Sequence, residues 1–197
     1  MPKHWTLAIA SLAAVASLSM LAPARASAQA ATTTPASGAA MKADLLHWIS
    51  DAEDKLNQLS DAMPAAKYSW RPGKGVRSVG EVYMHVASAN YGIPSMWGAP
   101  VPAGFKVETY EKSLTSKADI QKALKESFVS LKEKINGLND ADFDRPITMF
   151  GSPSTVRSAC FLILSHCHEH LGQSIAYART NHVVPPWSRP APAKPTQ

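Results

Sequence analysis

The feature that most constrains the fold of this sequence is the return of apolar residues every three or four positions along four long stretches. The first stretch covers residues 40–63, and Pro64 ends it. Residues at this spacing lie on one face of an α-helix, because the helix has about 3.6 residues per turn. The apolar face of this predicted helix consists of Leu45, Ile49, Ala52, Leu56, Leu59 and Met63.

The same spacing predicts three more helices. The second, over residues 79–94, begins after Ser78, and Glu81 three positions later completes the pattern of a capping box. The third covers residues 116–137 and the fourth residues 155–181. Their inward faces consist of Val82, His85, Val86 and Ala89 in the second helix, Ile120, Ala123, Leu124, Phe128, Leu131 and Ile135 in the third, and Val156, Ala159, Ile163, His166, His170, Gln173 and Tyr177 in the fourth.

Four amphipathic helices predict an all-α fold, and specifically an antiparallel four-helix bundle. No stretch of similar length alternates between polar and apolar residues, although residues 147–150 have the composition of a short extended piece. The chain has 197 residues, 45% of them hydrophobic, which is enough to bury a core without disulfide bonds. Cys160 and Cys167 lie about 10 Å apart along the fourth helix, so they are predicted to be small buried residues rather than a disulfide.

The first 28 residues have the three parts of a secretory signal peptide. Lys3 supplies a positive charge, residues 5–21 are largely apolar, and residues 22–30 contain small side chains in overlapping Ala-x-Ala cleavage patterns. An N-terminal membrane anchor is the alternative interpretation. The apolar run is short and ends in cleavage-site residues, which favours cleavage and a periplasmic or secreted protein.

Beyond residues 1–28, the predicted organisation is a flexible linker over residues 29–39, the helical bundle over residues 40–188 and a loose C-terminal tail over residues 189–197. The net charge of the whole chain is +5, and cleavage after Ala28 removes two positive charges and leaves +3. This excess is too small to indicate a nucleic-acid partner. No later stretch is long and apolar enough to span a bilayer.

Three histidines occupy positions where a helical stripe predicts a buried apolar residue. His85 lies between Val82 and Ala89, while His166 and His170 lie one turn apart in the fourth helix. Residues four apart have Cβ atoms roughly 5–6 Å apart, so two imidazoles can bind one ion, and a facing helix can supply the third. Buried imidazoles without partners would cost about 1–3 kcal/mol each, which a divalent ion removes. Three protein ligands leave a position for water, as in catalytic sites.

Each of these histidines also has a simpler explanation. A single histidine on an apolar face is more often a hydrogen-bonded core residue, and a His-x-x-x-His pair also occurs by chance. His168 is expected to face solvent, about 200° around the helix from its neighbour in the pair. Glu81 either caps the second helix, which is favoured, or orients His85 or binds the metal. Glu169 is either a charge at the rim or a group that supports a ligand, and Gln173 either hydrogen-bonds a ligand ring or a bound substrate, or packs.

Several short motifs occur in a fixed order along the chain: Tyr68-Ser69-Trp70-Arg71-Pro72, Arg77-Ser78-Val79-Gly80-Glu81 with His85 four residues later, His166-Cys167-His168-Glu169-His170-Leu171-Gly172-Gln173, Tyr177-Ala178-Arg179 and Val184-Pro185-Pro186-Trp187. With these motifs, the span from about Leu45 to Trp187 resembles the DinB-like superfamily of four-helix metal-binding proteins. The resemblance implies that His85, His166 and His170 bind a divalent ion, commonly zinc or nickel. Glu169 and Leu171 replace a histidine and an arginine that the family often has, which leaves the ligands intact and the substrate open.

The expected function is that of an exported metal-dependent enzyme. Some relatives resemble thiol-dependent S-transferases, in which the metal lowers the pKa of a small thiol, and the same physics would activate water for hydrolysis. A transferase or a hydrolase is therefore expected, with an unknown small-molecule substrate and a pocket bordered by residues 92–115 and Trp70. The alternatives are a non-catalytic metal-binding or interaction protein of the cell envelope, and a plain helical bundle. No stable membrane span is expected, and a homodimer is left open.

Overall fold

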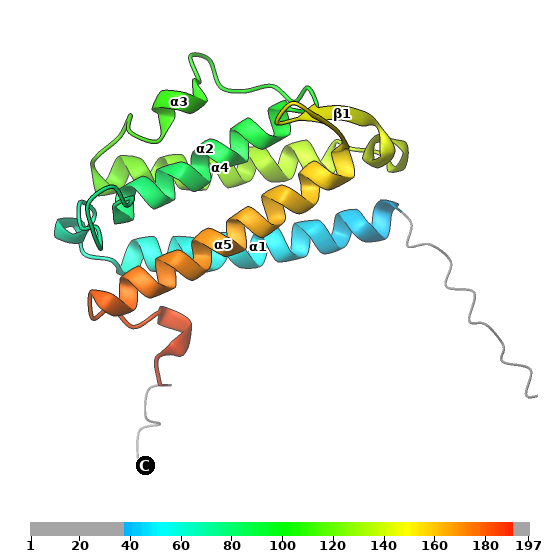
Figure 1. Ribbon diagram of the computed structural model, residues 1–197. Coiled ribbons are helices and arrows are strands. Elements are labelled where there is room, and N and C mark those ends of the chain that lie inside the picture. Colours follow the sequence, from blue (N-terminus) through cyan, green and yellow to red (C-terminus); the bar gives the residue numbers. More distant parts are fainter. Residues whose placement is uncertain (1–37, 191–197) are drawn as a thin grey trace, which may run out of the picture. The chain divides into compact units, whose positions relative to one another are not determined.

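The computed structural model describes residues 38–190 of the chain, and four long helices make up most of this part (Figure 1). They are α1 (Gly38–Ala62), α2 (Val79–Ser95), α4 (Lys117–Asn136) and α5 (Val156–Thr180). Each helix begins and ends within two residues of a helix predicted from the sequence. The expected signal peptide, most of the expected linker and most of the expected tail lie outside the described residues.

The long helices are joined by shorter elements. These are the one-turn helix α3 (Val107–Tyr110), the 3₁₀ helices η1 (Ala65–Lys67), η2 (Asp140–Asp144) and η3 (Pro186–Ser188), and the strands β1 (Pro146–Met149) and β2 (Ser152–Thr155). Within residues 38–190, no helix is both long and apolar enough to cross a bilayer.

The four long helices pack in the order α1, α4, α2, α5 around the core, because α1 and α2 each contact both α4 and α5. Two adjacent pairs run in opposite directions. Lys42, near the start of α1, donates to the carbonyl of Asn136 at the end of α4, and Lys117 at the start of α4 donates to the carbonyl of Asp61. The hydroxyl of Tyr177, near the end of α5, donates to the carbonyl of Arg77 just before α2.

The other two adjacent pairs are parallel, so the prediction of an antiparallel bundle is wrong for them. Gly80 packs against Ile120 near the starts of α2 and α4, and Asn90 donates to Ser127 further along both helices. In α1 and α5, Arg157 contacts Met41 near the two starts. The physical reason is the long connection over residues 96–116, which we call the crossover segment. It contains α3 and crosses from the end of α2 back to the start of α4 (Figure 1).

The predicted apolar stripes form the core of the bundle. Every member of the stripes predicted for α1 and α4 is buried, and so are Cys160 and Cys167, which are free thiols. Helix α2 is buried around most of its circumference, because α4, α5 and the crossover segment all pack against it. Asn90 is a fully buried polar residue within this core: it donates to Ser127 of α4 at 3.0 Å and accepts from the Cys167 thiol of α5 at 3.6 Å.

A short hairpin precedes α5. Its strands β1 and β2 pair antiparallel, from Met149 opposite Ser152 to Pro146 opposite Thr155. The two residues between the strands, Phe150 and Gly151, both have a positive φ, of 50° and 81°, as the tight turn of a two-residue hairpin requires. The extended piece predicted over residues 147–150 is confirmed for residues 147–149, whereas Phe150 lies in the turn. No sequence pattern indicates β2, whose residues Ser-Pro-Ser-Thr lack an apolar alternation.

Candidate metal centre

The structure brings together the three histidines that the sequence singled out. His85 comes from α2, and His166 and His170 come from α5, which runs antiparallel to it. Each offers one ring nitrogen, and these three atoms lie within 4.8 Å of one another. The Nε2 atoms of His85 and His166 are 3.1 Å apart, and the ring centroids of the three residues are separated by 4.4–4.9 Å. We call these three residues the histidine cluster.

The other ring nitrogens of two cluster members are held by partners outside the cluster. Nδ1 of His85 lies 3.0 Å from Oε2 of Glu111, and Nδ1 of His170 lies 2.8 Å from Oε1 of Gln173. A carboxylate oxygen or an amide oxygen can only accept a hydrogen bond, so both rings carry hydrogen on Nδ1 and keep a lone pair on Nε2. This is the arrangement in which histidine binds a metal through Nε2 while a second residue orients the ring.

The surroundings of the cluster favour the uncharged form of two of its members, His85 and His166. Burial lowers the pKa of His166 from 6.5 to about 3, and the nearby His170 and His85 add to this shift. Burial also lowers the pKa of His85, as do the charges of Arg77 and His170, while Glu111 opposes the shift. Neutral imidazoles are the form that binds a divalent ion.

The cluster fits a divalent ion better than it fits a self-contained hydrogen-bond network. His85 and His170 carry their hydrogen on Nδ1, so only His166 could place a hydrogen between the nitrogens that face one another. The cluster can therefore form at most one internal hydrogen bond, and the other lone pairs would lie close together without a donor. Nδ1 of His166 is buried and has no hydrogen-bond partner among the described residues. Three nitrogen donors suit a divalent transition-metal ion, and a cation satisfies all three lone pairs at once.

Glu111 is the residue of the site that sequence analysis did not identify. It follows α3 in the crossover segment, and its second oxygen, Oε1, accepts from Nε of Arg77 at 2.8 Å. Glu111 therefore joins the crossover segment to both the start of α2 and the histidine cluster. No periodic pattern marks it, because the segment is irregular, and its contact with His85 spans 26 residues of sequence.

Gln173 has the hydrogen-bonding role that was one of its two predicted interpretations. Its Oε1 accepts from His170, and its Nε2 donates to the hydroxyl of Tyr177 at 3.0 Å. That hydroxyl donates in turn to the carbonyl of Arg77 at 3.2 Å. The chain of hydrogen bonds fixes the side of the His170 ring that faces away from the cluster.

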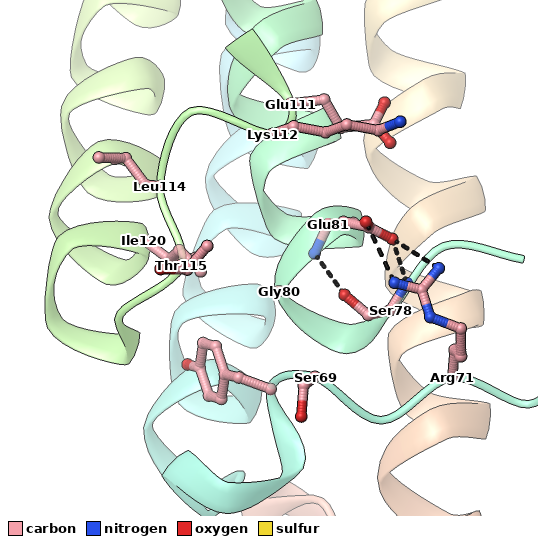
Figure 2. A pocket seen from close by; sticks show the side chains of 11 residues that line it. Ser69, Arg71, Ser78, Gly80, Glu81, Glu111, Lys112, Leu114, Thr115 and Ile120 are labelled. Carbon is pink, nitrogen blue, oxygen red and sulfur yellow. Dashed lines mark hydrogen bonds and ion pairs between the residues drawn. The ribbon is translucent and has the colours of Figure 1, made fainter. Parts of the chain in front are cut away.

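Glu81 serves as a helix cap, as the sequence favoured. Its carboxylate accepts from the backbone nitrogen of Ser78 at 2.7 Å, while the Ser78 hydroxyl accepts from the backbone nitrogen of Glu81. It also pairs with Arg71 at 3.1 Å, so Figure 2 shows it turned towards Ser78 and Arg71. Among the described contacts, none joins Glu81 to His85, and none joins the exposed Glu169 to the histidine cluster.

Two other sequence predictions need correction. His168 points away from the cluster but does not simply face solvent: it is half-buried, and its ring lies edge-on to Trp48 of α1, with centroids 6.4 Å apart. The helix α1 covers this side of α5, which a single-helix projection cannot reveal. Trp70, expected at the rim of a pocket, instead packs edge-on against Tyr177 at 5.3 Å.

A cavity of about 930 Å³ lies beside the histidine cluster, and His85 and His166 form part of its wall. The rest of the wall comes from α2, α5, the crossover segment and the tip of the hairpin. The prediction that residues 92–115 border a pocket is therefore confirmed. We call this cavity the histidine pocket. Its size falls within the range of roughly 300–1,000 Å³ that is typical of small-molecule sites.

Comparisons with known structures agree with the fold. A DinB-like protein from Bacillus cereus superimposes with a TM-score of 0.64 at 19% identity, over 72% of this chain and 93% of that chain. A DinB-like protein from Bacillus subtilis gives 0.59 at 17% identity, over 75% and 96%. YfiT from Bacillus subtilis, described as a probable metal-dependent hydrolase with an unusual four-helix bundle topology, gives 0.58 at 15% identity, over 73% and 89%.

Among proteins of curated function, none matches the sequence significantly. The sequence model of the DinB superfamily matches residues 49–174, a span that contains α2, α4 and all three members of the histidine cluster. Since this match covers more than half of the chain, and the fold agrees with it, the protein belongs to the DinB superfamily.

Proposed function

We propose that this protein is a metal-dependent enzyme in which His85, His166 and His170 bind one divalent ion, zinc or nickel. The observation that carries the proposal is the convergence of three imidazoles, two of which, His85 and His166, line an accessible pocket. The description of YfiT, which shares the fold, as a probable metal-dependent hydrolase supports the same class of activity. Hydrolysis or transfer of a thiol group is the proposed reaction type.

The residues of this chain have distinct parts in such a reaction. The histidine cluster would hold the ion, which when bound lowers the pKa of water or of a small thiol. Glu111 and Gln173 orient two of the rings, and Arg77 holds Glu111 in place. The histidine pocket would hold the substrate beside the cluster.

We favour hydrolysis over thiol transfer, and we propose that the protein is exported. The support for export is the signal-peptide pattern of residues 1–28, and small thiol cosubstrates are found mainly in the cytosol. N-terminal sequencing of protein from the envelope fraction is expected to give a mature chain that begins at Ser27, Gln29 or Ala31. A full-length chain with Met1 in the cytosol would contradict export.

A non-catalytic metal-binding protein of the cell envelope is the second candidate. The observation that favours it is the state of Glu111, the carboxylate that contacts the cluster. Both of its oxygens are occupied, one by Arg77 and one by His85, so it is not free to act as a general base. Slow ligand exchange and a complete coordination shell would support this candidate over the enzyme.

The test is the metal content of four single variants. His85→Ala, His166→Ala and His170→Ala are each expected to lose most of the bound zinc or nickel, because each removes one of three ligands. His168→Ala is the matched control, since it lies on the same helix but packs against Trp48 instead of the cluster. Circular dichroism would establish that every variant is folded.

The outcome separates the candidates. A folded His85→Ala protein that kept the metal stoichiometry and affinity of the parent would show that the cluster is not the metal site. If the cluster does bind metal, ester and thiol substrates would be screened with the parent protein. Activity that disappears with the metal in the three ligand variants supports the enzyme, and metal binding without any turnover supports the second candidate.

A further inference from the structure

The wall of the histidine pocket is largely apolar. Ile93 of α2, Leu162 of α5, and Met96 and Phe105 of the crossover segment contribute apolar side chains beside the two histidines. Such a wall gains free energy when an apolar molecule replaces water against it, by about 25 cal/mol for each Å² covered. The pocket is therefore suited to the body of an apolar molecule.

The rim of the same pocket exposes large apolar side chains to solvent. Val101, Val107 and Phe150 are 40%, 53% and 77% exposed, and all three line the pocket. Phe150 lies at the tip of the hairpin, as one of its two turn residues with positive φ. Exposed apolar side chains that gather around one opening, instead of being scattered singly, indicate a surface that a ligand covers.

The charges of the side chains that line the pocket sum to zero. Arg77 and Lys106 are basic, and Glu108 and Glu111 are acidic, so the four contribute no net charge. Arg77 and Glu111 are also paired with each other at 2.8 Å. A pocket for a phosphate or a multiply charged substrate would instead contain an excess of arginine and lysine. The wall thus offers no compensation for the desolvation of a charged ligand.

We propose that the histidine pocket binds uncharged molecules with an apolar body, an aliphatic chain or an aromatic ring, and an oxygen-bearing head group placed at His85 and His166. The apolar body lies along Ile93, Met96 and Leu162 and extends under Val107 and Phe150. The role of these molecules as substrates rests on the proposed function, whereas their binding to the pocket does not. Esters and amides of medium-length acyl chains have this chemistry.

The test uses butanamide, hexanamide and octanamide as uncharged probes of increasing length. Their binding to the metal-free protein would be measured by displacement of the uncharged dye Nile red. Each pair of added methylene groups is expected to tighten binding several-fold, with about fifteenfold as the limit for complete burial. Octanoate, which has the same chain and a negative charge, is expected to bind more weakly than octanamide, and glutathione is expected not to displace the dye.

Two variants of matched residue type and exposure locate the binding site. Val107 is 53% exposed at the rim of the pocket, and Val129 is 51% exposed on α4 and does not line it. Val107→Asp is expected to weaken octanamide binding and to reduce the dependence on chain length, because it places a charge beside the apolar body. Val129→Asp is expected to leave both unchanged. Both positions are exposed, so neither change should unfold the protein.

Three results would overturn the proposal: binding that does not change with chain length, glutathione or octanoate binding as tightly as octanamide, or equal effects of the two valine variants. Because no metal is present in these measurements, they stand apart from the test of the metal site. Length-dependent amide binding in a protein without a metal site would contradict the proposed function alone. A metal-binding protein with no preference for longer amides would contradict the pocket assignment alone.

Discussion

The three histidines of the cluster differ in what holds the ring nitrogen that points away from it. Glu111 holds His85, Gln173 holds His170, and Nδ1 of His166 is buried without a partner among the described residues. His166 is thus oriented by packing and by its neighbours in the cluster, and the other two rings are oriented by hydrogen bonds. The two residues that form those bonds are expected to matter for metal affinity nearly as much as the ligands themselves.

Glu111→Ala is expected to weaken metal binding by about 10- to 100-fold while leaving the three ligands in place. The reason is that the His85 ring loses the acceptor that fixes its tautomer and its orientation. Glu108→Ala is the matched control, because Glu108 lies in the same segment and lines the same pocket. Zinc affinity would be measured by competition with a chromogenic chelator, and Glu111→Gln, which keeps an acceptor oxygen, should recover part of the affinity. Equal affinities for the two alanine variants would mean that Glu111 does not position His85.

The lowered pKa of His166 also predicts how the metal-free protein responds to acid. In the unfolded chain this histidine takes up a proton near its ordinary pKa of 6.5, whereas in the folded chain it does so only near 3. Between these values the unfolded state binds the additional proton, so stability is present above pH 6.5 and is lost as the pH falls towards 3. Urea unfolding across this range should show a shallower loss for His166→Ala than for His168→Ala. An identical slope in the two variants would contradict the burial of a neutral His166.

At the scale of single elements, the sequence predicted best those helices that bury one face. Helices α1 and α4 have a polar side, so the 3.6-residue period of their apolar residues is clear, and both stripes are buried as predicted. Helix α2 is covered on several sides, so its buried residues exceed the predicted stripe and include Tyr83, Met84 and Ala87. Strand β2 has no apolar alternation, because it is a short exposed partner of β1, and sequence periodicity cannot reveal it.

The residues of the candidate site likewise differ in whether the sequence could identify them. His85, His166 and His170 could be selected from the sequence because each replaces an apolar residue in a helical stripe. Glu111 could not, since its position depends on the path of the crossover segment between α2 and α4 and not on any local pattern. The role of Gln173 lay between these cases: its spacing from His170 permitted the hydrogen bond, and the fold determined that it forms.

Ile163→Asp tests the packing of α5 directly. Ile163 is fully buried and lies one turn before His166, so an aspartate there would place an unpaired charge in the core. The substitution is expected to remove much of the free energy of unfolding, which is roughly 5–15 kcal/mol for a domain of ordinary size. The variant should therefore be unfolded or aggregated. Phe161→Asp, on the same helix but 52% exposed, is expected to change the melting temperature little. Equal melting temperatures in both variants and the parent would mean that the inward face of α5 is assigned wrongly.

At the scale of the whole described bundle, the number and the ends of the long helices could be predicted from the sequence, but their directions could not. The period of a stripe is the same whichever way a helix runs, and the direction of α4 is decided by the length of the crossover segment. The resulting order places α2 and α5 side by side and antiparallel. This pairing brings His85 to the level of His166 and His170, so the topology is what assembles the cluster.

The topology leads to a prediction for the stability of the whole fold. A divalent ion at the cluster would join α2 to α5 and so link two segments separated by 81 residues of sequence. The unfolded chain has no preformed site, so the ion binds the folded state preferentially and stabilises it by mass action, by about 2.7 kcal/mol at a concentration 100 times the dissociation constant. Calorimetric scans of the parent and of His168→Ala are therefore expected to show a melting temperature that rises with zinc or nickel concentration. In His85→Ala the two remaining ligands lie on one helix, so the ion no longer joins α2 to α5 and the rise should be small. A rise of the same size in His85→Ala would mean that the metal stabilises the protein from another site.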